Sequence, residues 1–488
     1  MRRWWLGLGS LAAAVIATAA LVASAAARPP APIESRLTRS NEPETTTTTA
    51  AAAPTTTAST LAPTTTTAPP IPDGPVTTQL EAALNDPSLV GRKLAVSVVD
   101  DANRPIFDFH GRAPLLPAST LKLVTAAAAL RTLGPGFQYV THLNATTAPR
   151  SDGVLDGSLV LVGAGDPTLG TPEFGSVTPT RPRTPLEALA DRVAALGVRR
   201  ITGNVFADPW IFPEQPTAPG WYPEYITEGD ASRVSGLTVN GGRRVFRNAG
   251  GSLASEPAAD PATEAAVSLR ELLIERGVQI DGVAGAVRPV PASPVPLGAV
   301  ASHPLAEVLR FMVQESDNRI ADAVFRTVGY AAGRNARWDA SAVAVRRALD
   351  TLGLDWSGVR VFDGSGLSRH DRVPPRFLAA LDAAMTRSPQ GALWQDLMAM
   401  AGVRGTLEHR LVGSLAQGRV IGKTGTLRDV KSLAGTVTGP EGRYHFAVIG
   451  NGLDQAGRLA VQRLQDRVAL ALARDLEGCF VAPHPGCH

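Results

Sequence analysis

The chain has 488 residues, more than one typical domain holds and enough to bury sizeable hydrophobic cores. Its formal net charge is only +3 and no basic stripe with interleaved aromatic residues is present, which argues against a nucleic-acid-binding protein. The eight histidines form no His-Glu-x-x-His pattern and no other ligand spacing, so we expect neither a metal site nor a cofactor.

The N-terminus predicts export. Arg2 and Arg3 precede an uncharged, apolar stretch through Ala27, which is the pattern of a signal sequence. Residues 1–27 are therefore either a cleaved signal peptide or a single membrane anchor, and any membrane contact is expected only through this segment. Residues 28–75 are rich in threonine, alanine and proline and cannot bury enough apolar surface to fold, so we expect a disordered linker in the cell envelope.

Folded structure is expected from about residue 76. Residues 93–99 alternate between apolar and polar positions as a strand does, and residues 105–109 are the expected return strand. The alanine-rich, apolar run that follows Lys122 predicts a buried helix, with Pro117 just before its start.

Ser119 and Lys122 are three residues apart at the first turn of this helix, which puts both side chains on one face. A serine hydroxyl is a poor nucleophile until a base takes its proton, and a lysine kept neutral by burial can be that base. The start of the helix also offers free N–H groups to a developing oxyanion. Taken alone, the pair is more often a capping serine and a lysine whose ammonium reaches solvent.

Strand and helix patterns alternate in the middle of the chain. Residues 158–162 and 200–206 read as strands, and residues 265–276 read as a helix. We therefore predict a mixed α/β domain at residues 146–295 that is inserted into a catalytic domain, whose two parts are residues 76–145 and 296–488.

One further helix is expected inside the insertion. Thr184 and Glu187 are spaced as a capping box, with Pro185 at the first helical position. Gly197 is the expected end of this helix. Its apolar stripe is expected to consist of Leu186, Leu189, Val193 and Leu196.

Two further motifs follow the insertion. Ser316-Asp317-Asn318 comes after an expected helix that begins at Pro304, and Lys423-Thr424-Gly425-Thr426 lies near the end of the chain. Each alone has an ordinary structural explanation, a turn or cap for the first and an edge strand with a solvated lysine for the second. The order S-x-x-K, S-D-N, K-T-G is far more specific than any one motif, because it is the set found in penicillin-binding proteins and serine β-lactamases.

The C-terminal part predicts a sheet and a closing helix. Residues 421–426, 433–438 and 444–450 read as three neighbouring antiparallel strands. Residues 459–476 read as a long helix with Leu464, Val468 and Leu472 on one face. In an exported protein, Cys479 and Cys487 are expected to form a local disulfide, the alternative being two free thiols.

With these residues in view, the chain resembles the class C low-molecular-mass penicillin-binding proteins, the D-alanyl-D-alanine carboxypeptidase/endopeptidase family, over about residues 78–475. Residues 163–169, 363–369 and 405–407 also look like this family. The resemblance implies an α/β (α+β) fold with a serine β-lactamase/transpeptidase-like catalytic domain. In that domain an antiparallel sheet is flanked by helices, and the inserted domain splits it.

The resemblance implies a role for each catalytic residue. Ser119 would attack the carbonyl between two D-alanines, and Lys122 would take its proton. Ser316 would pass a proton to the leaving amine, with Lys423 holding this network by charge. Asn318 would donate a hydrogen bond to a backbone carbonyl of the substrate.

The resemblance also implies a substrate site along the last motif. Thr424 and Thr426, with Gly425 between them, would hold the free C-terminal carboxylate, and the N–H groups of Ser119 and Thr426 would form the oxyanion hole. Further substrate-binding positions are expected at Arg369, Leu367, Trp221 and Glu224, where Arg369 either lines a pocket for a peptide carboxylate or binds its own loop. The family's tyrosine beyond Glu224 is absent, because Gly229 and Asp230 stand there.

The sequence therefore predicts a serine DD-peptidase that trims the terminal D-alanine of peptidoglycan stem peptides, cuts D-alanine cross-links, or does both, and that binds β-lactam antibiotics. One alternative is a serine β-lactamase or esterase, which needs a group that activates water. The chain lacks the extra glutamate motif of class A β-lactamases, and it has Ser316 where class C β-lactamases have tyrosine. The other alternative is an inactive wall-binding scaffold, against which the intact Ser119, Lys122 and Lys423 argue.

Overall fold

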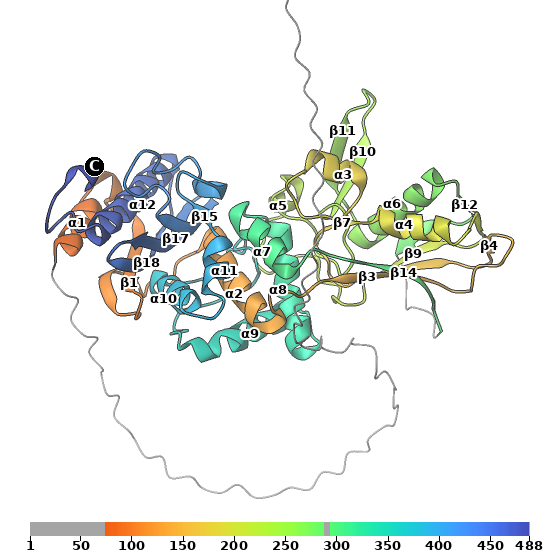
Figure 1. Ribbon diagram of the computed structural model, residues 1–488, viewed down its shortest axis with the longest axis horizontal. Coiled ribbons are helices and arrows are strands. Elements are labelled where there is room, and N and C mark those ends of the chain that lie inside the picture. The colour runs from red at the N-terminus through yellow and green to blue at the C-terminus, as the bar shows by residue number, and fades with distance from the viewer. Residues whose placement is uncertain (1–73, 287–292, 488) are drawn as a thin grey trace, which may run out of the picture. The chain divides into compact units, whose positions relative to one another are not determined.

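The computed structural model describes residues 74–286 and 293–487 (Figure 1). The predicted signal peptide or anchor at 1–27 lies outside these residues, as does nearly all of the predicted linker at 28–75. The first described helix is α1 (Pro75–Leu84), which agrees with the expected start of folded structure near residue 76.

The first of two main sheets is antiparallel throughout and has six strands, in the order β15-β16-β17-β18-β1-β2. Its strands are β1 (Lys93–Asp100), β2 (Pro105–Phe109), β15 (Ala399–Met400), β16 (Val420–Leu427), β17 (Val430–Gly439) and β18 (Gly442–Asn451). This confirms the antiparallel sheet of the predicted fold class and the three neighbouring strands near the C-terminus.

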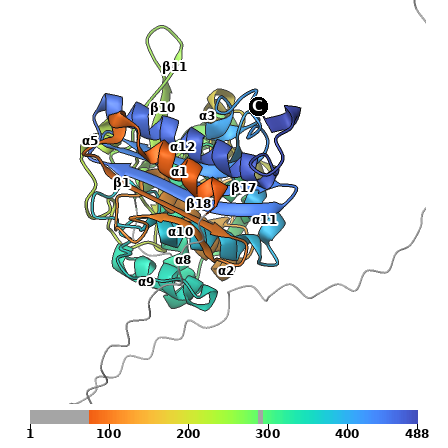
Figure 2. The ribbon, with the colours of Figure 1, turned by 90° about the vertical axis from the view of Figure 1, so that its left-hand side faces the viewer.

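Helices cover both faces of this sheet (Figure 2). On one face, α12 (Gln455–Leu476) packs on β17 and β18 with α1 beside it. The predicted apolar face of α12 is confirmed, because Leu464, Val468 and Leu472 are all buried. On the other face, α10 (Pro375–Thr386) contacts β1, β17 and β18. The remaining helices of this part are α2 (Lys122–Leu133), α7 (Leu305–Gln314), α8 (Asn318–Gly333), α9 (Trp338–Leu349) and α11 (Gly391–Asp396).

The second main sheet is mixed and has five strands, in the order β13-β9-β5-β3-β14. Its strands are β3 (Val140–Ala145), β5 (Leu159–Val162), β9 (Val205–Asp208), β13 (Ala284–Ala286) and β14 (Val295–Ala301). The helices α4 (Glu187–Ala195) and α6 (Pro261–Glu275) pack on it around an aliphatic core.

Two strands of this sheet, β3 and β14, lie partly or wholly outside the predicted bounds of the insertion. β3 and β14 both belong to the second sheet, so this sheet draws on residues 140–301 and not only on 146–295. The two chain crossings lie side by side just beyond these strands, where the Ser302 N–H donates to the Tyr139 carbonyl at 2.9 Å. The antiparallel pairing of β3 with β14 therefore extends the second sheet to the crossings themselves.

The predicted capping box at the start of α4 is wrong. Thr184 lies in the two-residue strand β7 (Thr184–Pro185), and its hydroxyl contacts that of Thr168 at 2.9 Å. Glu187 is the first residue of α4, and its carboxylate binds the Arg183 guanidinium at 2.7 Å. Thr168, from a preceding segment, and Arg183, four residues before Glu187, have thus taken the two polar groups of the expected cap.

Two smaller differences concern the same region. The strand expected at 200–206 is interrupted and forms β8 (Arg200–Ile201) and β9, which belong to different sheets. Leu196 follows the last turn of α4 and is 43% exposed, so it is not part of the buried stripe. The remaining short elements are α3 (Pro172–Val177), α5 (Glu224–Thr227), β4 (Val154–Leu155), β6 (Leu169–Gly170), β10 (Arg243–Arg247), β11 (Leu253–Pro257) and β12 (Gln279–Ile280).

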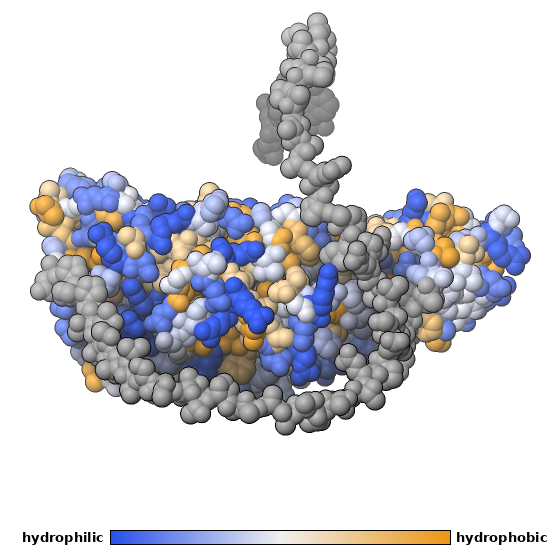
Figure 3. Space-filling view, turned by 90° about the horizontal axis from the view of Figure 1, so that it is seen from below, coloured by the Kyte–Doolittle hydropathy of each residue, from blue (hydrophilic) through white to orange (hydrophobic). Residues whose placement is uncertain are grey.

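On the face shown in Figure 3, hydrophilic and hydrophobic residues are intermingled over the described part of the chain. Within residues 74–286 and 293–487, no helix combines the length and the apolar character that a membrane crossing requires.

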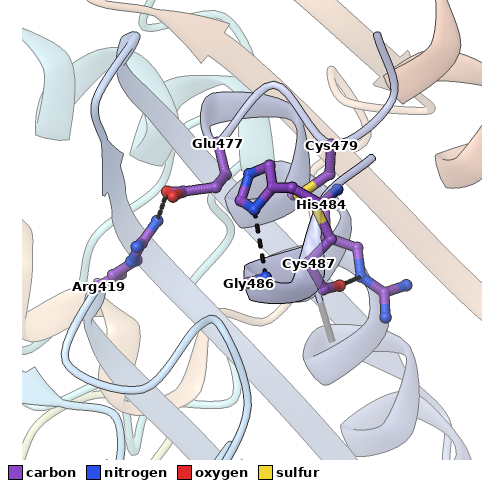
Figure 4. The surroundings of a disulfide bond; sticks show 7 residues. Arg419, Glu477, Cys479, His484, Gly486 and Cys487 are labelled. Carbon is purple, nitrogen blue, oxygen red and sulfur yellow. Dashed lines mark hydrogen bonds and ion pairs between the residues drawn. A yellow bond between two sulfur atoms is a disulfide. The ribbon is translucent and has the colours of Figure 1, made fainter. Parts of the chain in front are cut away.

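The C-terminal tail is closed by a disulfide between Cys479 and Cys487 (Figure 4). His484 lies beside it, but both sulfur atoms are used in the bond and so do not form a thiolate metal site. Glu477 at the end of α12 pairs with Arg419, which directly precedes β16. The Arg474 Nε on α12 donates to the Cys487 carbonyl at 3.1 Å, which fixes the tail to the closing helix.

Candidate active site

The first and second motifs meet at the Lys122 ammonium. Ser119 is half-buried in a 3₁₀ turn (Ala118–Leu121), and Lys122 follows it as the first, fully buried residue of α2. The Lys122 Nζ donates to the Ser119 Oγ at 3.0 Å, to the Asn318 Oδ1 at 2.6 Å and to the Ser365 carbonyl at 2.8 Å. Three segments far apart in sequence therefore converge on one amine.

The environment of Lys122 suits a general base. Burial lowers the pKa of Lys122 to about 8. The negative charges of Asp322, Asp363 and Asp317 favour the ammonium and partly oppose this lowering. A base acts best when its pKa lies near the working pH. Close to neutrality, a fraction of Lys122 is therefore able to accept the Ser119 proton.

Two buried carboxylates lie behind Lys122, and sequence reasoning missed both. The Asp322 Oδ1 accepts from the Gly364 N–H at 2.9 Å, and burial raises the pKa of Asp322 well above its usual value. The Asp363 Oδ1 accepts from the Gly366 N–H at 2.7 Å. A signal for Asp322 did exist, because it is four residues after Asn318 and so shares its face of α8.

The Ser316-Asp317-Asn318 segment forms the start of α8. The Asp317 Oδ1 caps the helix by accepting from the Ile320 N–H at 2.9 Å. Its carboxylate also pairs with Arg181, which comes from the inserted part of the chain that carries the five-stranded sheet. Burial opposes the ionisation of Asp317, yet Arg181 holds its pKa below the usual value. Ser316 has a positive φ of 63° and directly precedes this cap, which places it at the junction of α7 and α8.

The third motif lies on β16, and its side chains alternate as predicted. Lys423 is buried and donates to the Thr424 carbonyl at 2.9 Å. Burial lowers the pKa of Lys423 well below its usual range, and the nearby Lys122 charge adds to this effect. On the other face, the Thr424 Oγ1 donates to the Thr406 Oγ1 at 2.8 Å, and the Lys431 Nζ donates to the Thr426 Oγ1 at 3.1 Å. Lys431 was not predicted, and it adds a cation beside the two threonines.

Gly425 brings this strand close to the nucleophile. A Cβ at position 425 would lie 2.9 Å from the Pro117 carbonyl oxygen and 3.0 Å from the Ser119 nitrogen. It would also lie 2.2 Å from the Ser432 Oγ. A side chain at this position would therefore push β16 away from Ser119, and with it the N–H of Thr426 that is expected in the oxyanion hole.

Two of the other predicted substrate-binding residues are held within the protein. The Trp221 Nε1 donates to the Asp363 Oδ2 at 2.7 Å, which links it to the carboxylates behind Lys122. Leu367 is only 4% exposed and packs with Ile226 and Ala231. The burial of Leu367 favours a packing role over direct contact with a substrate.

Of the other two, Glu224 is exposed and Arg369 is half-buried. Glu224 is the exposed first residue of α5. The Arg369 Nη2 pairs with the Asp429 Oδ2 at 2.7 Å, and its guanidinium lies 5.8 Å from the centre of the Tyr222 ring. A peptide carboxylate that bound Arg369 would share its guanidinium with Asp429. Both roles of Arg369, lining a pocket for a peptide carboxylate and binding its own loop, therefore stay predictions.

Comparison with known proteins identifies the family. The family model described as D-Ala-D-Ala carboxypeptidase 3 (S13) matches residues 76–258 and 248–472. The chain belongs to this family. The prediction of a class C low-molecular-mass penicillin-binding protein is thereby confirmed.

Individual S13 relatives match most of the chain. A D-alanyl-D-alanine carboxypeptidase from an Actinomadura species is 32% identical over 467 residues, covering 81% of this chain and 84% of the relative. Carboxypeptidase DacB of Mycolicibacterium smegmatis is 32% identical over 402 residues, covering 80% and 82%. The crystal structure of penicillin binding protein 4 (dacB) from Haemophilus influenzae shares the fold, with a TM-score of 0.67, 22% identity and coverage of 80% of this chain and 98% of that one.

Proposed function

We propose that this S13 family member is a serine DD-peptidase of the cell envelope that hydrolyses the D-Ala-D-Ala bond of peptidoglycan stem peptides. The observation that carries the proposal is the convergence of Ser119, Asn318 and the Ser365 carbonyl on the buried Lys122. Membership of the S13 family and relatives with the name D-alanyl-D-alanine carboxypeptidase support it.

The reaction proceeds through an acyl-enzyme on Ser119. Neutral Lys122 takes the hydroxyl proton while the Ser119 Oγ bonds to the carbonyl carbon of the penultimate D-alanine. The carbon–nitrogen bond then breaks, and Ser316 passes the proton to the departing amine. Water subsequently cleaves the ester, which releases the shortened peptide and restores the Ser119 hydroxyl.

The peptide is held along β16. Thr424 and Thr426 donate to its C-terminal carboxylate, and the Lys431 ammonium beside Thr426 makes this arrangement charge-assisted. The N–H groups of Ser119 and Thr426 donate to the oxyanion. They lie close enough to do so because position 425 has no side chain that would push β16 away from Ser119. A β-lactam enters as a substrate mimic and leaves a long-lived acyl group on Ser119.

Labelling with a fluorescent penicillin, together with release of D-alanine from a synthetic pentapeptide, tests this proposal against its alternatives. Stable labelling and D-alanine release are the expected results. Rapid turnover of the label without D-alanine release would favour a β-lactamase, and the absence of both signals would favour a wall-binding scaffold.

A further inference from the structure

Two side chains from the six-stranded sheet hold the residues just before Ser119. The Ser432 Oγ on β17 donates to the Pro117 carbonyl at 2.6 Å. The Asn451 side chain at the end of β18 accepts from the Leu116 N–H at 2.7 Å and donates to the Leu116 carbonyl at 3.0 Å. Both side chains are buried, so these hydrogen bonds are shielded from water. Three hydrogen bonds therefore tie the two residues to the sheet.

Ser432 reaches Pro117 across β16, at the position of Gly425. Ser432 and Gly425 are direct partners in the antiparallel pairing of β16 with β17, so their side-chain positions share one face. A Cβ at position 425 would lie 2.2 Å from the Ser432 Oγ and 2.9 Å from the Pro117 carbonyl oxygen. The hydroxyl thus occupies the space that the glycine leaves open. It thereby sets the separation between β16, which carries the Thr426 N–H, and the turn that carries Ser119.

Ala118 lies between these tied residues and Ser119, and its backbone conformation needs support. Its φ of 49° is in the left-handed region, which is disfavoured for a residue with a Cβ. The peptide group that joins Ala118 to Ser119 carries the Ser119 N–H, so the conformation of Ala118 decides where this N–H points. Such a conformation persists only where the surroundings impose it. The hydrogen bonds to Leu116 and Pro117 act from one side. From the other side Gly366 packs so closely that a Cβ there would lie 1.9 Å from the Ala118 carbonyl oxygen.

The Ser432 hydroxyl is not needed to satisfy a buried acceptor. The Pro117 carbonyl also accepts from the Thr120 Oγ1 at 2.7 Å, within the same turn. If the Ser432 hydroxyl is removed, that carbonyl keeps a partner, and the cost of an unpaired buried acceptor is avoided. What is lost is the connection between the turn and the sheet, so the effect of such a change should fall on the placement of Ser119.

We infer that Ser432 and Asn451 are positioning residues that aim the Ser119 N–H, together with the Thr426 N–H, at the developing oxyanion. This inference rests on the proposed serine peptidase function. The oxyanion forms only when the Ser119 Oγ bonds to the carbonyl carbon, so a misplaced N–H weakens the transition state more than the bound substrate. The peptide carboxylate, held by the hydroxyls of Thr424 and Thr426 on the other face of β16, should bind as before.

The test compares Ser432→Ala with a matched control on the same strand. Thr436→Val also removes a buried hydroxyl from β17, one that donates to the Asp382 Oδ2 at 2.6 Å. Position 436 is four residues along the strand from Ser432, about 13 Å away. Asn451→Leu is a second test variant, because leucine is of similar size and makes neither hydrogen bond of the asparagine.

Each protein is measured in four ways. Its thermal unfolding reports stability, pentapeptide hydrolysis gives kcat and KM, and stopped flow gives the rate of acylation by penicillin. The fourth measurement is the affinity for a peptide boronic acid. Boronic acids form a tetrahedral adduct with a serine hydroxyl, which places an oxygen where the oxyanion forms.

We expect Ser432→Ala and Asn451→Leu to lower kcat and the acylation rate roughly tenfold or more, with KM within about twofold of that of the original protein. The affinity for the boronic acid should fall by a similar factor. Thr436→Val should lower the midpoint of thermal unfolding and leave the three activity measurements within about twofold of the original.

An acylation rate of Ser432→Ala within twofold of the original, a rise in KM with kcat unchanged, or equal activity losses in Ser432→Ala and Thr436→Val would each overturn the inference. Failure of both test variants to fold would do the same, because the two residues would then be structural. If the original protein is acylated by penicillin but hydrolyses no pentapeptide, the proposed DD-peptidase function fails, while the acylation rates still decide the positioning role. An original protein that penicillin does not acylate would contradict both.

Discussion

The regions around the two main sheets differ in where they bury charge. The core of the five-stranded sheet is aliphatic, with leucine, valine, isoleucine and alanine side chains between the strands, α4 and α6. Beside the six-stranded sheet, Lys122, Lys423, Asp322 and Asp363 are all buried. Burial lowers the pKa values of the two lysines and raises the pKa of Asp322. Burying a charged group costs free energy, so the concentration of buried charged groups next to Ser119 marks the region that performs chemistry.

Beside the six-stranded sheet lies a second group of charged residues, in which His445 and Asp382 are buried and Asp101 is half-buried. His445 on β18 lies between the Asp382 Oδ2 at 2.7 Å and the Asp101 Oδ1 at 3.0 Å. Trp394 also binds the Asp382 carboxylate at 2.8 Å. Hydrogen bonds join this group to Thr436 on β17 and Arg443 on β18, whereas the charges around Lys122 lie beside the nucleophile. The comparison therefore predicts that changes near Lys122 affect catalysis and that changes near His445 affect stability.

Replacing Lys122 should have the largest effect on catalysis. Lys122→Met removes the base, so the rate of acylation by penicillin should fall by about 10²–10⁴-fold, which is the usual range for general-base catalysis. Lys93→Met is the matched control, because Lys93 is exposed at the start of β1. Stopped-flow acylation measures both variants. An acylation rate of Lys122→Met within tenfold of the original would show that another group takes the proton.

Thr424→Val should have the next largest effect. The change keeps the shape of β16 but removes a hydroxyl donor, so a peptide with a free C-terminal carboxylate should lose roughly tenfold in kcat/KM. An analogue with that carboxylate amidated should lose much less. Steady-state hydrolysis of the two peptides measures the difference. Equal losses would instead indicate that Thr424 only supports the strand through Thr406.

Asp322→Asn should shift a pH profile without abolishing activity. The Asp322 charge raises the pKa of Lys122, so its removal should lower that pKa and move the rising limb of the acylation rate to lower pH. The shift should be on the order of one pH unit, as expected for one charge at close range in a protein interior. The side-chain oxygen of the introduced asparagine can still accept the hydrogen bond from the Gly364 N–H, so the local structure should be kept. Acylation measured from pH 6 to 9 tests this, and an unmoved midpoint would mean that Asp322 carries no charge in this range.

His445→Gln should have the smallest effect on catalysis, with an acylation rate within about twofold of the original. Burial disfavours the charged ring, but the hydrogen bonds with Asp382 and Asp101 raise the pKa of His445 above its usual value. A raised pKa in the folded state stabilises the fold fully below the unfolded pKa, about 6.5. This contribution is lost as the pH rises through the folded value.

The variant should therefore lose about 2 kcal/mol of unfolding free energy at pH 6 and less at alkaline pH. Urea unfolding at several pH values measures this. A loss that is the same at every pH would mean that the imidazole is neutral.

Much of the site could be predicted from short-range patterns. The three-residue spacing of Ser119 and Lys122 put both on one face, and strand alternation put Thr424 and Thr426 opposite Lys423. These relations depend only on helix and strand geometry. The order of the motifs predicted the family, which the comparisons confirm.

The remaining features depend on contacts that no local pattern encodes. Arg181 is 136 residues from its partner Asp317, and Asp363 reaches Lys122 only because the loop around Gly366 folds back against Ala118. The expected cap at Thr184 failed in part for the same reason, since Thr168 takes its hydroxyl, while Glu187 pairs with the nearby Arg183. The predicted roles of Glu224 and Arg369 stay predictions, because each depends on a bound peptide.

The central claim is that Ser119 is the acylated nucleophile. Mass spectrometry of the protein after reaction with benzylpenicillin tests it most directly, by locating the adduct in a proteolytic digest. We predict one adduct, on the peptide that carries Ser119, and none in Ser119→Ala, whose folding is checked by its thermal transition. An adduct on any other peptide, or one that persists in Ser119→Ala, would contradict the account.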